Sequence, residues 1–247
     1  LPSEGFLTEQ LDDIDPGMLR SARNRVRVEV AHALADRLMA LVAAGHWRSP
    51  YRLGVSAASR RALANTALQL LCALGEADAV TRAQAQFEGA DNMTDRLGAL
   101  QALLLTTPSR SEAALAAFAR EYADEPSVMD KWFSLQATMH RLPGAPPVLD
   151  RVLELTRHPA YSLHNPNKVR ALLNAFCTGN LAEFHRDDGR GYRLWTEQVL
   201  ELDRVNPQVA ARLARALDRH TKFAGPLRAL MRDALAEVAR NARSADV

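Results

Sequence analysis

The sequence predicts an all-α fold, a superhelical α-solenoid built from degenerate ARM-like or HEAT-like helical pairs. Apolar residues recur at the helical period along most of the chain, helix-start signals divide it at short intervals, and no segment shows the alternation of a strand. We expect about eleven helices, joined by loops of roughly two to eight residues. Because sequential helices with short connections pack as neighbours, a long series of them favours a solenoid over a four-helix bundle.

Two parts of the chain differ in composition. Residues 1–17 mix proline, glycine and acidic residues with a few large apolar ones, and we expect an extended entry segment with one short helix. Residues 18–247 are expected to form a single α-helical repeat domain, because this length can bury roughly 70–75% of the unfolded surface without metals or disulfides. The chain opens with Leu1-Pro2 rather than Met, so we expect a piece of a longer protein.

Sequence signals that mark the start of a helix occur along the whole chain. A first amphipathic run covers residues 18–44 and ends at Gly45, and residues 46–51 form a loop. Later helices begin at capping residues or prolines, including a Ser-x-x-Glu capping box at Ser109. Their expected starts are Ser56, residue 76, Asn92, Ser109, Pro126, Pro147, Pro166, residue 191, Pro207 and residue 224.

Two Asn-Pro pairs, at 165–166 and 206–207, flank a His-Arg-Asp-Asp-Gly-Arg-Gly-Tyr turn at 185–192. Each pair starts a helix whose apolar stripe faces a core and whose opposite face is polar. The first polar face carries Asn167, Arg170 and Asn174, and the second carries Arg212 among other arginines. Such faces are usually solvated charge, and the alternative is a cavity wall that meets an anionic group.

Composition excludes several classes. The net charge is +2 and the hydrophobic content 47%, and basic and acidic residues are mixed along every segment, so we expect no nucleic-acid partner. No apolar run approaches the roughly 20 residues of a membrane helix, so we expect no membrane partner. Cys72 and Cys177 lie apart in apolar stretches and read as buried, inert thiols. With no export signal either, we expect a cytoplasmic protein.

A search for catalytic motifs finds none. No histidine lies in a His-Glu-x-x-His pattern, and there is neither a phosphate-binding GxxxxGK loop nor a Gly-x-Ser-x-Gly elbow. His185, Asp187 and Asp188 lack the spacing of a calcium loop and are interpreted as a structural turn. The aromatic pairs Trp132–Phe133 and Tyr192–Trp195 are interpreted as core residues. We therefore expect no catalytic residue and no metal ligand in this chain.

Six sequence blocks run in order across nearly the whole chain: LPSE at 1–4, DNMTD at 91–95, VMDKWF at 128–133, NPNKVR at 165–170, FHRDDGRGY at 184–192 and NPQVAARL at 206–213. Together they resemble the carboxy-terminal helical domain of the bacterial aminopeptidase N family, which are M1-family zinc alanyl aminopeptidases. A shared solenoid shape alone would say nothing about function, whereas ordered sequence blocks are specific.

The resemblance implies that the chain is a non-catalytic domain of a multidomain enzyme that removes N-terminal residues from peptides. Its zinc and its His-Glu-x-x-His helix would lie in an upstream catalytic domain, which would be the partner of this one, and this chain itself would hold no cofactor. The domain would close over the active site and line the substrate cavity. The resemblance also implies a further short helix beyond Val247. Arg170, Arg212 and Asn167 are the candidate residues that would face the cavity.

Two other functions remain open. A stand-alone helical-repeat scaffold would bind a protein or peptide in its concave face without any enzymatic role. A nucleic-acid-binding solenoid is disfavoured by the near-neutral charge, since such binding depends on many phosphate contacts.

Overall fold

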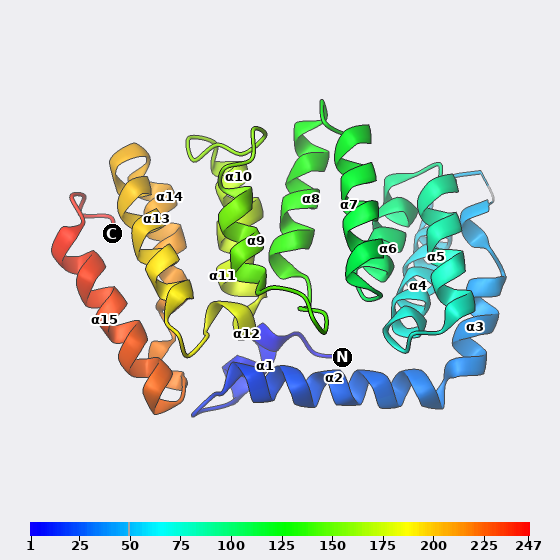
Figure 1. The fold of residues 1–247 in the computed structure, drawn as a ribbon, viewed down its shortest axis with the longest axis horizontal. Helices are drawn as coiled ribbons and strands as arrows, with labels where there is room; N and C mark the ends of the chain where they lie inside the picture. Colours follow the sequence, from blue (N-terminus) through cyan, green and yellow to red (C-terminus); the bar gives the residue numbers. More distant parts are fainter. Residues whose placement is uncertain (49) are drawn as a thin grey trace. The chain divides into compact units, whose positions relative to one another are not determined.

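The described residues, 1–48 and 50–247, fold into helices in this computed structural model, with no β-strand among them (Figure 1). Their only strand-like pairing is an isolated bridge between Ile14 and Phe223. The expected loop 46–51 includes Ser49, which lies outside the described residues, and His46–Arg48 form a 3-10 turn. The prediction of an all-α fold is confirmed.

The helices group into two compact units. Unit 1 comprises Leu1–Ala22, Tyr122–Arg141 and Pro146–Val247, and unit 2 comprises Arg23–Glu121 and Leu142–Ala145. Helix α2 (Pro16–Ala33) has residues in both. The single domain 18–247 expected from the sequence stays a prediction.

Unit 2 is a series of antiparallel helices. Neighbours in sequence pack together, α3 on α4 and α5 on α6, and α4 also packs on α6, as Figure 1 shows for the cyan helices. Its core is largely aliphatic. Leu68, Leu71, Leu100 and Leu103 are almost fully buried, and the ring of Phe118 is buried as well. The bounds are α3 Ala35–Ala43, α4 Val55–Ala73, α5 Ala77–Gly89, α6 Met93–Leu103 and α7 Pro108–Glu121.

Unit 1 has a more aromatic core. Phe133, Phe176, Phe184 and Trp195 are almost fully buried, and Phe184 meets Phe176 edge to face. Helix α13 packs on both α14 and α15. The bounds are α1 Glu4–Gln10, α8 Pro126–Thr138, α9 Val148–Leu155, α10 Pro166–Val169, α11 Ala175–Gly179, α12 Leu181–Phe184, α13 Arg190–Val205, α14 Pro207–Ala214 and α15 Gly225–Asn241.

The asparagine caps predicted from the sequence are formed. Asn92 accepts a hydrogen bond from the N–H of Asp95 at 3.0 Å, and Asn206 accepts one from the N–H of Val209 at 3.2 Å. Each bond satisfies one of the N–H groups that a first helical turn leaves without a partner. Three proline or asparagine signals, at Asn92, Pro126 and Pro207, therefore placed their helices correctly.

Other predicted starts are wrong by one or two residues. Ser56 does not cap α4, which begins at Val55 after Gly54, a residue with φ +135°. Ser109 cannot form the expected capping box, because α7 already begins at Pro108. Proline fits the first helical position through its fixed φ, so it takes precedence over the serine that follows. Pro147 likewise precedes α9 instead of opening it.

Fifteen α-helical segments are found within the described residues, more than the eleven or so expected. One cause is a break in the run 18–44 at Leu34, whose φ of −114° and ψ of 10° lie outside the α region and separate α2 from α3. The other is a series of short segments between Asn165 and His185. Hydrophobic periodicity continues across such breaks, so it does not reveal them.

The entry segment is held on unit 1. The N–H of Ile14 donates to the carbonyl of Lys222, and the N–H of Ala224 donates to the carbonyl of Ile14. Two ion pairs add to this contact, Glu9 with Arg219 at 3.0 Å and Glu4 with Arg20 at 3.0 Å. The one short helix expected in this segment is α1.

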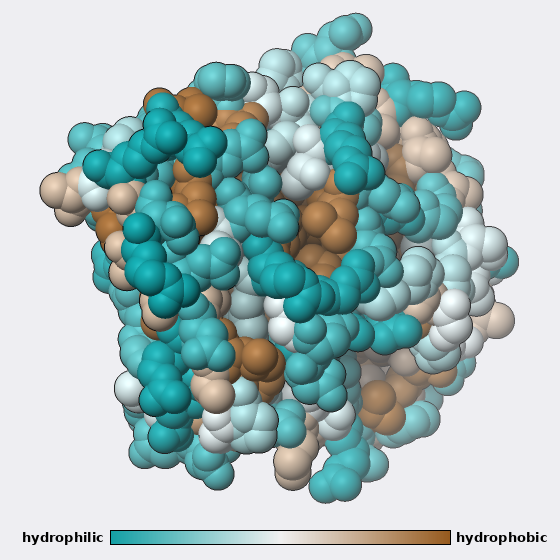
Figure 2. Space-filling model, turned by 60° about the vertical axis from the view of Figure 1, so that its left-hand side comes forward, coloured by the Kyte–Doolittle hydropathy of each residue, from teal (hydrophilic) through white to brown (hydrophobic). Residues whose placement is uncertain are grey.

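Among the described residues, no helix combines the length and the apolar character needed to cross a membrane. On the face drawn in Figure 2, apolar side chains form separate patches among hydrophilic ones.

Gly191 is required by close packing at the start of α13. A Cβ at this position would overlap the backbone carbonyl of Phe184, which cannot move away as a flexible side chain would. Gly191→Ala should therefore lower the free energy of unfolding by about 1–3 kcal/mol, the usual cost of overpacking. Gly225→Ala is the matched control, because nothing lies within 4 Å of the added Cβ, and it should be neutral or slightly stabilising. Chemical denaturation of both variants measures the difference, and equal effects would contradict the packing argument.

Candidate functional site

The two helices that begin with Asn-Pro form the walls of one small pocket in unit 1. Its volume is about 50 Å³, which is room for a few water molecules or a carboxylate group. The lining residues are Pro166, Val169, Arg170, Asn174, Val209, Arg212 and Leu213. We call the pocket that these residues line the arginine pocket.

Asparagine caps fix where each wall begins. Asn165 accepts a hydrogen bond from the N–H of Asn167 at 2.9 Å, and Pro166 takes the first helical position of α10. Asn206 and Pro207 do the same for α14. Because a helix places residues three and four apart on one face, the caps determine which side chains of each wall reach the pocket.

The wall that carries Arg170 is not a regular α-helix. Residues Arg170–Asn174 form a π-helical turn between α10 and α11, and the N–H of Ala175 donates to the carbonyl of Arg170, five residues earlier. Both Arg170 and Asn174, the ends of this turn, line the pocket. Single π-helical turns within α-helices occur frequently at functional sites.

The arginine pocket is positively charged. Arg170 and Arg212 bring two guanidinium groups, and none of its seven described lining residues is acidic. Arg170 donates from Nη2 to Oδ1 of Asn167 at 2.9 Å. An arginine held by a neutral amide keeps its charge uncompensated, so the pocket attracts an anionic group. Both arginines are exposed, which limits what a single ion pair would contribute to about 0.2–1 kcal/mol.

The structure thus brings together two of the three residues selected from the sequence. Arg170 and Arg212 lie 42 positions apart in the chain and line one pocket, whereas Asn167 lies outside its lining and orients Arg170. Asn174 was on the polar face in the sequence, but its place at the end of a π-helical turn has no sequence signal. Whether these residues contact a substrate stays a prediction.

The His185 turn is structural. His185 is buried, with its Nδ1 3.0 Å from the hydroxyl of Tyr192 and its ring stacked near Phe223. Asp188 accepts from the side chain of Arg186 and from the N–H of Arg190. The Arg186 and Arg190 contacts hold the pKa of the Asp188 carboxyl below its usual range against the effect of desolvation.

Among the described residues, neither a metal-binding group nor the two aromatic pairs form a second candidate functional site. Within residues 1–48 and 50–247, no group of three or more His, Cys, Asp or Glu side chains is arranged to hold a metal ion. Trp132, Phe133, Tyr192 and Trp195 are all buried, as expected of core residues.

One family profile, described as a domain of unknown function (DUF3458_C) with ARM repeats, matches residues 1–247. This chain belongs to the DUF3458_C family. The match confirms the expectation of ARM-like helical pairs, and it covers the entry segment as well as the helices that follow.

Curated relatives of this DUF3458_C domain are aminopeptidases. The chain is 36% identical to aminopeptidase N of Caulobacter vibrioides over 238 residues, which is 96% of the chain and 27% of the relative. It is also 36% identical to aminopeptidase N of Escherichia coli over 239 residues, again 27% of that protein. The chain is therefore homologous to the carboxy-terminal domain of aminopeptidase N and spans about a quarter of the length of these relatives.

A solved structure has the same fold. The crystal structure of Legionella pneumophila aminopeptidase A in complex with aspartic acid matches with a TM-score of 0.88 and 30% sequence identity. The match covers 100% of this chain and 29% of the Legionella protein.

Because His185 is buried, we expect the stability of this domain to depend on pH. Burial lowers the pKa of His185 from its ordinary 6.5 to about 3, because the folded protein favours the neutral ring. The stabilisation is complete above pH 6.5 and is lost progressively as the pH falls toward 3, where the unfolded state binds the proton more readily. His185→Gln should therefore show a weaker loss of stability between pH 7 and pH 4 than the wild type, measured by denaturant unfolding at each pH. His164, which is exposed, supplies the control His164→Gln, and an unchanged slope in His185→Gln would contradict the prediction.

Proposed function

We propose that this domain is the non-catalytic carboxy-terminal part of a zinc-dependent M1 aminopeptidase. Its helices would close over an upstream catalytic domain and line the cavity through which peptides reach the metal. The homology to the carboxy-terminal part of aminopeptidase N supports this proposal. No step of the reaction is assigned to the residues of this chain.

Arg170 and Arg212 would attract the carboxylate of a bound peptide. The observation that carries this proposal is that two guanidiniums, from helices far apart in sequence, line one pocket without an acidic residue among its described lining. The pocket volume of about 50 Å³ has room for a carboxylate group.

Coulomb attraction gives the size of the effect. A charge pair at about 4 Å is worth about 4 kcal/mol at an effective dielectric of 20, but solvent reduces exposed pairs to about 0.2–1 kcal/mol. Enclosure of the pocket by other domains would move each arginine toward the upper value. The arginines would therefore contribute to the affinity for peptides and not to the chemical step.

The steering role is tested in the full-length enzyme. Arg170→Gln and Arg212→Gln should each raise KM for Ala-Ala-Ala by about 1.4- to 5-fold, the equivalent of 0.2–1 kcal/mol, with kcat unchanged. KM for Ala-Ala-Ala-amide, which lacks the carboxylate, should stay near the wild-type value. The exposed Arg204 on α13 gives the control Arg204→Gln, which should alter neither.

Two results would contradict these proposals separately. Equal changes in KM for the acid and the amide would contradict the steering role of the two arginines but not the aminopeptidase assignment. A full-length protein that is zinc-free and releases no N-terminal residue from either peptide would overturn the aminopeptidase itself. The stand-alone scaffold, binding a protein or peptide without catalysis, would then take its place.

A further inference from the structure

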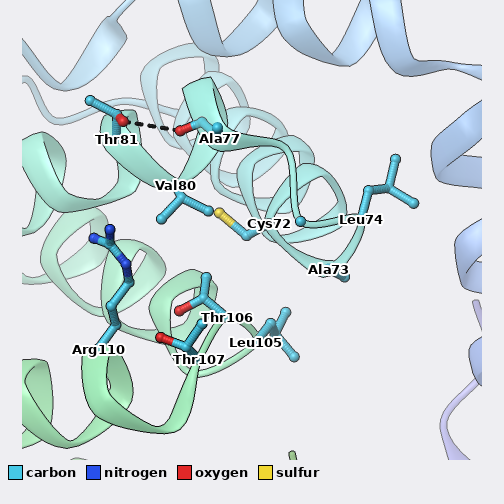
Figure 3. A pocket seen from close by; sticks show the side chains of 11 residues that line it. Cys72, Ala73, Leu74, Ala77, Val80, Thr81, Leu105, Thr106, Thr107 and Arg110 are labelled. Carbon is cyan, nitrogen blue, oxygen red and sulfur yellow. Dashed lines mark hydrogen bonds between the residues drawn. The ribbon is translucent and has the colours of Figure 1, made fainter. Parts of the chain in front are cut away.

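A second, larger pocket lies in unit 2 where four helices end. It has a volume of about 490 Å³, within the range of sites that hold a small ligand. The end of α4, the start of α5, the end of α6 and the start of α7 surround it (Figure 3). Its lining residues are Cys72, Ala73, Leu74, Gly75, Ala77, Val80, Thr81, Leu105, Thr106, Thr107 and Arg110, and we call it the helix-end pocket.

One side of the helix-end pocket is apolar. Figure 3 shows the side chains of Val80 and Cys72 close together, with Leu105 below them. Burial raises the pKa of the Cys72 thiol to about 12, so the sulfur is neutral and acts as part of the apolar wall, not as a nucleophile. A ligand that fills this side gains by covering aliphatic surface.

The other side carries a positive charge. The guanidinium of Arg110 lies at the edge of the pocket, and no hydrogen bond or ion pair to it is found among the described residues. No acidic side chain is among the described lining residues. The hydroxyls of Thr81 and Thr106 already donate to the carbonyls of Ala77 and Leu103, so they are left with acceptor capacity. Among the described lining residues a cationic ligand therefore has no acidic partner, whereas an anionic one has Arg110.

The start of α7 adds to the positive side of the pocket. Helix α5 begins after Glu76, whose side chain makes no capping bond, and α7 begins at Pro108. Arg110 itself lies in the first turn of α7, where the positive end of the helix dipole favours an anion beside it. The C-terminal turns of α4 and α6 are closed by their own backbone bonds, in which the carbonyls of Cys72 and Leu103 accept from the N–H groups of Gly75 and Thr106. The pocket therefore offers a positive charge and an apolar wall side by side.

We propose that the helix-end pocket binds the carboxy-terminal residue of a peptide that ends in an aliphatic side chain. The terminal carboxylate pairs with Arg110, and the aliphatic side chain covers Val80 and Leu105. A simple inorganic anion would use only the first of these features. The proposal stands on unit 2 alone and does not depend on the aminopeptidase assignment.

Binding is measured by calorimetry on the full-length protein that carries this chain, with N-acetyl-Ala-Ala-Leu as the probe. The acetyl group removes the free amino terminus, so the result does not depend on peptidase activity. The carboxamide of the same peptide should bind about 1.4- to 5-fold more weakly, because the ion pair with the exposed Arg110 is lost. Acetate, which lacks the aliphatic side chain, should bind more weakly still.

Three substitutions test whether the peptide binds in the helix-end pocket. Arg110→Gln should weaken binding of the acid by about 1.4- to 5-fold and leave the amide unchanged, and Arg110 is exposed, so the fold should tolerate the change. Arg120→Gln, at an exposed position near the other end of α7, is the matched control and should bind like the wild type. Ala77→Phe places a large side chain at the exposed start of α5 and should block the acid and the amide alike.

The proposal is overturned if the acid and the amide bind equally, if Arg110→Gln binds like the wild type, or if acetate binds as well as the peptide. It is also overturned if the probe does not bind at millimolar concentration. Loss of binding only in the double variant Arg170→Gln/Arg212→Gln would place the peptide in the arginine pocket and equally refute this site.

Discussion

One buried amide holds the middle of unit 1 together. Asn180 has no exposed surface, and its Nδ2 donates to the carbonyls of Ala137 at 2.9 Å and Met139 at 3.1 Å. Its Oδ1 accepts from Nη1 of Arg20 at 2.6 Å. The end of α8, the junction of α11 with α12 and the first residues of α2 therefore meet at one side chain. A buried amide is costly without partners, so this junction is favourable only when all three segments are in place.

Arg20 extends this junction to the entry segment. Its Nε and Nη2 donate to the two carboxylate oxygens of Glu4, both at 3.0 Å, while Nη1 serves Asn180. One guanidinium thus uses three donors on two partners in a fixed geometry, which a lysine could not reproduce. The side chains of Arg20 and Glu4 are largely shielded, with exposed fractions of 13% and 10%, so this pair is less screened than the surface pairs. Through these contacts, the position of residues 1–20 depends on the aromatic core of unit 1, which also supports α13 and α14.

Sequence reasoning predicted the features that depend on neighbouring residues. Asn165 and Asn206 were recognisable as caps because capping is local, and the polar faces with Arg170 and Arg212 followed from helical spacing. It could not show that these two faces line one pocket, since that depends on tertiary packing. Nor could it show why Gly191 is glycine, because the constraint is the carbonyl of Phe184 on another segment. The resemblance of the sequence blocks selected the two arginines, and the structure shows that they line the same pocket.

The π-helical turn at Arg170–Asn174 matters for how relatives are aligned. Its i to i+5 bonding accommodates one residue more than an α-helix of the same rise would. An α-helix turns by about 100° per residue, so losing one residue here would rotate the wall formed by Pro166 and Val169 by roughly that angle relative to α11. The aligned blocks on either side would still match, yet the arginine pocket would be gone. A single-residue gap at this point in a homologue therefore separates proteins that share the surface from proteins that share only the fold.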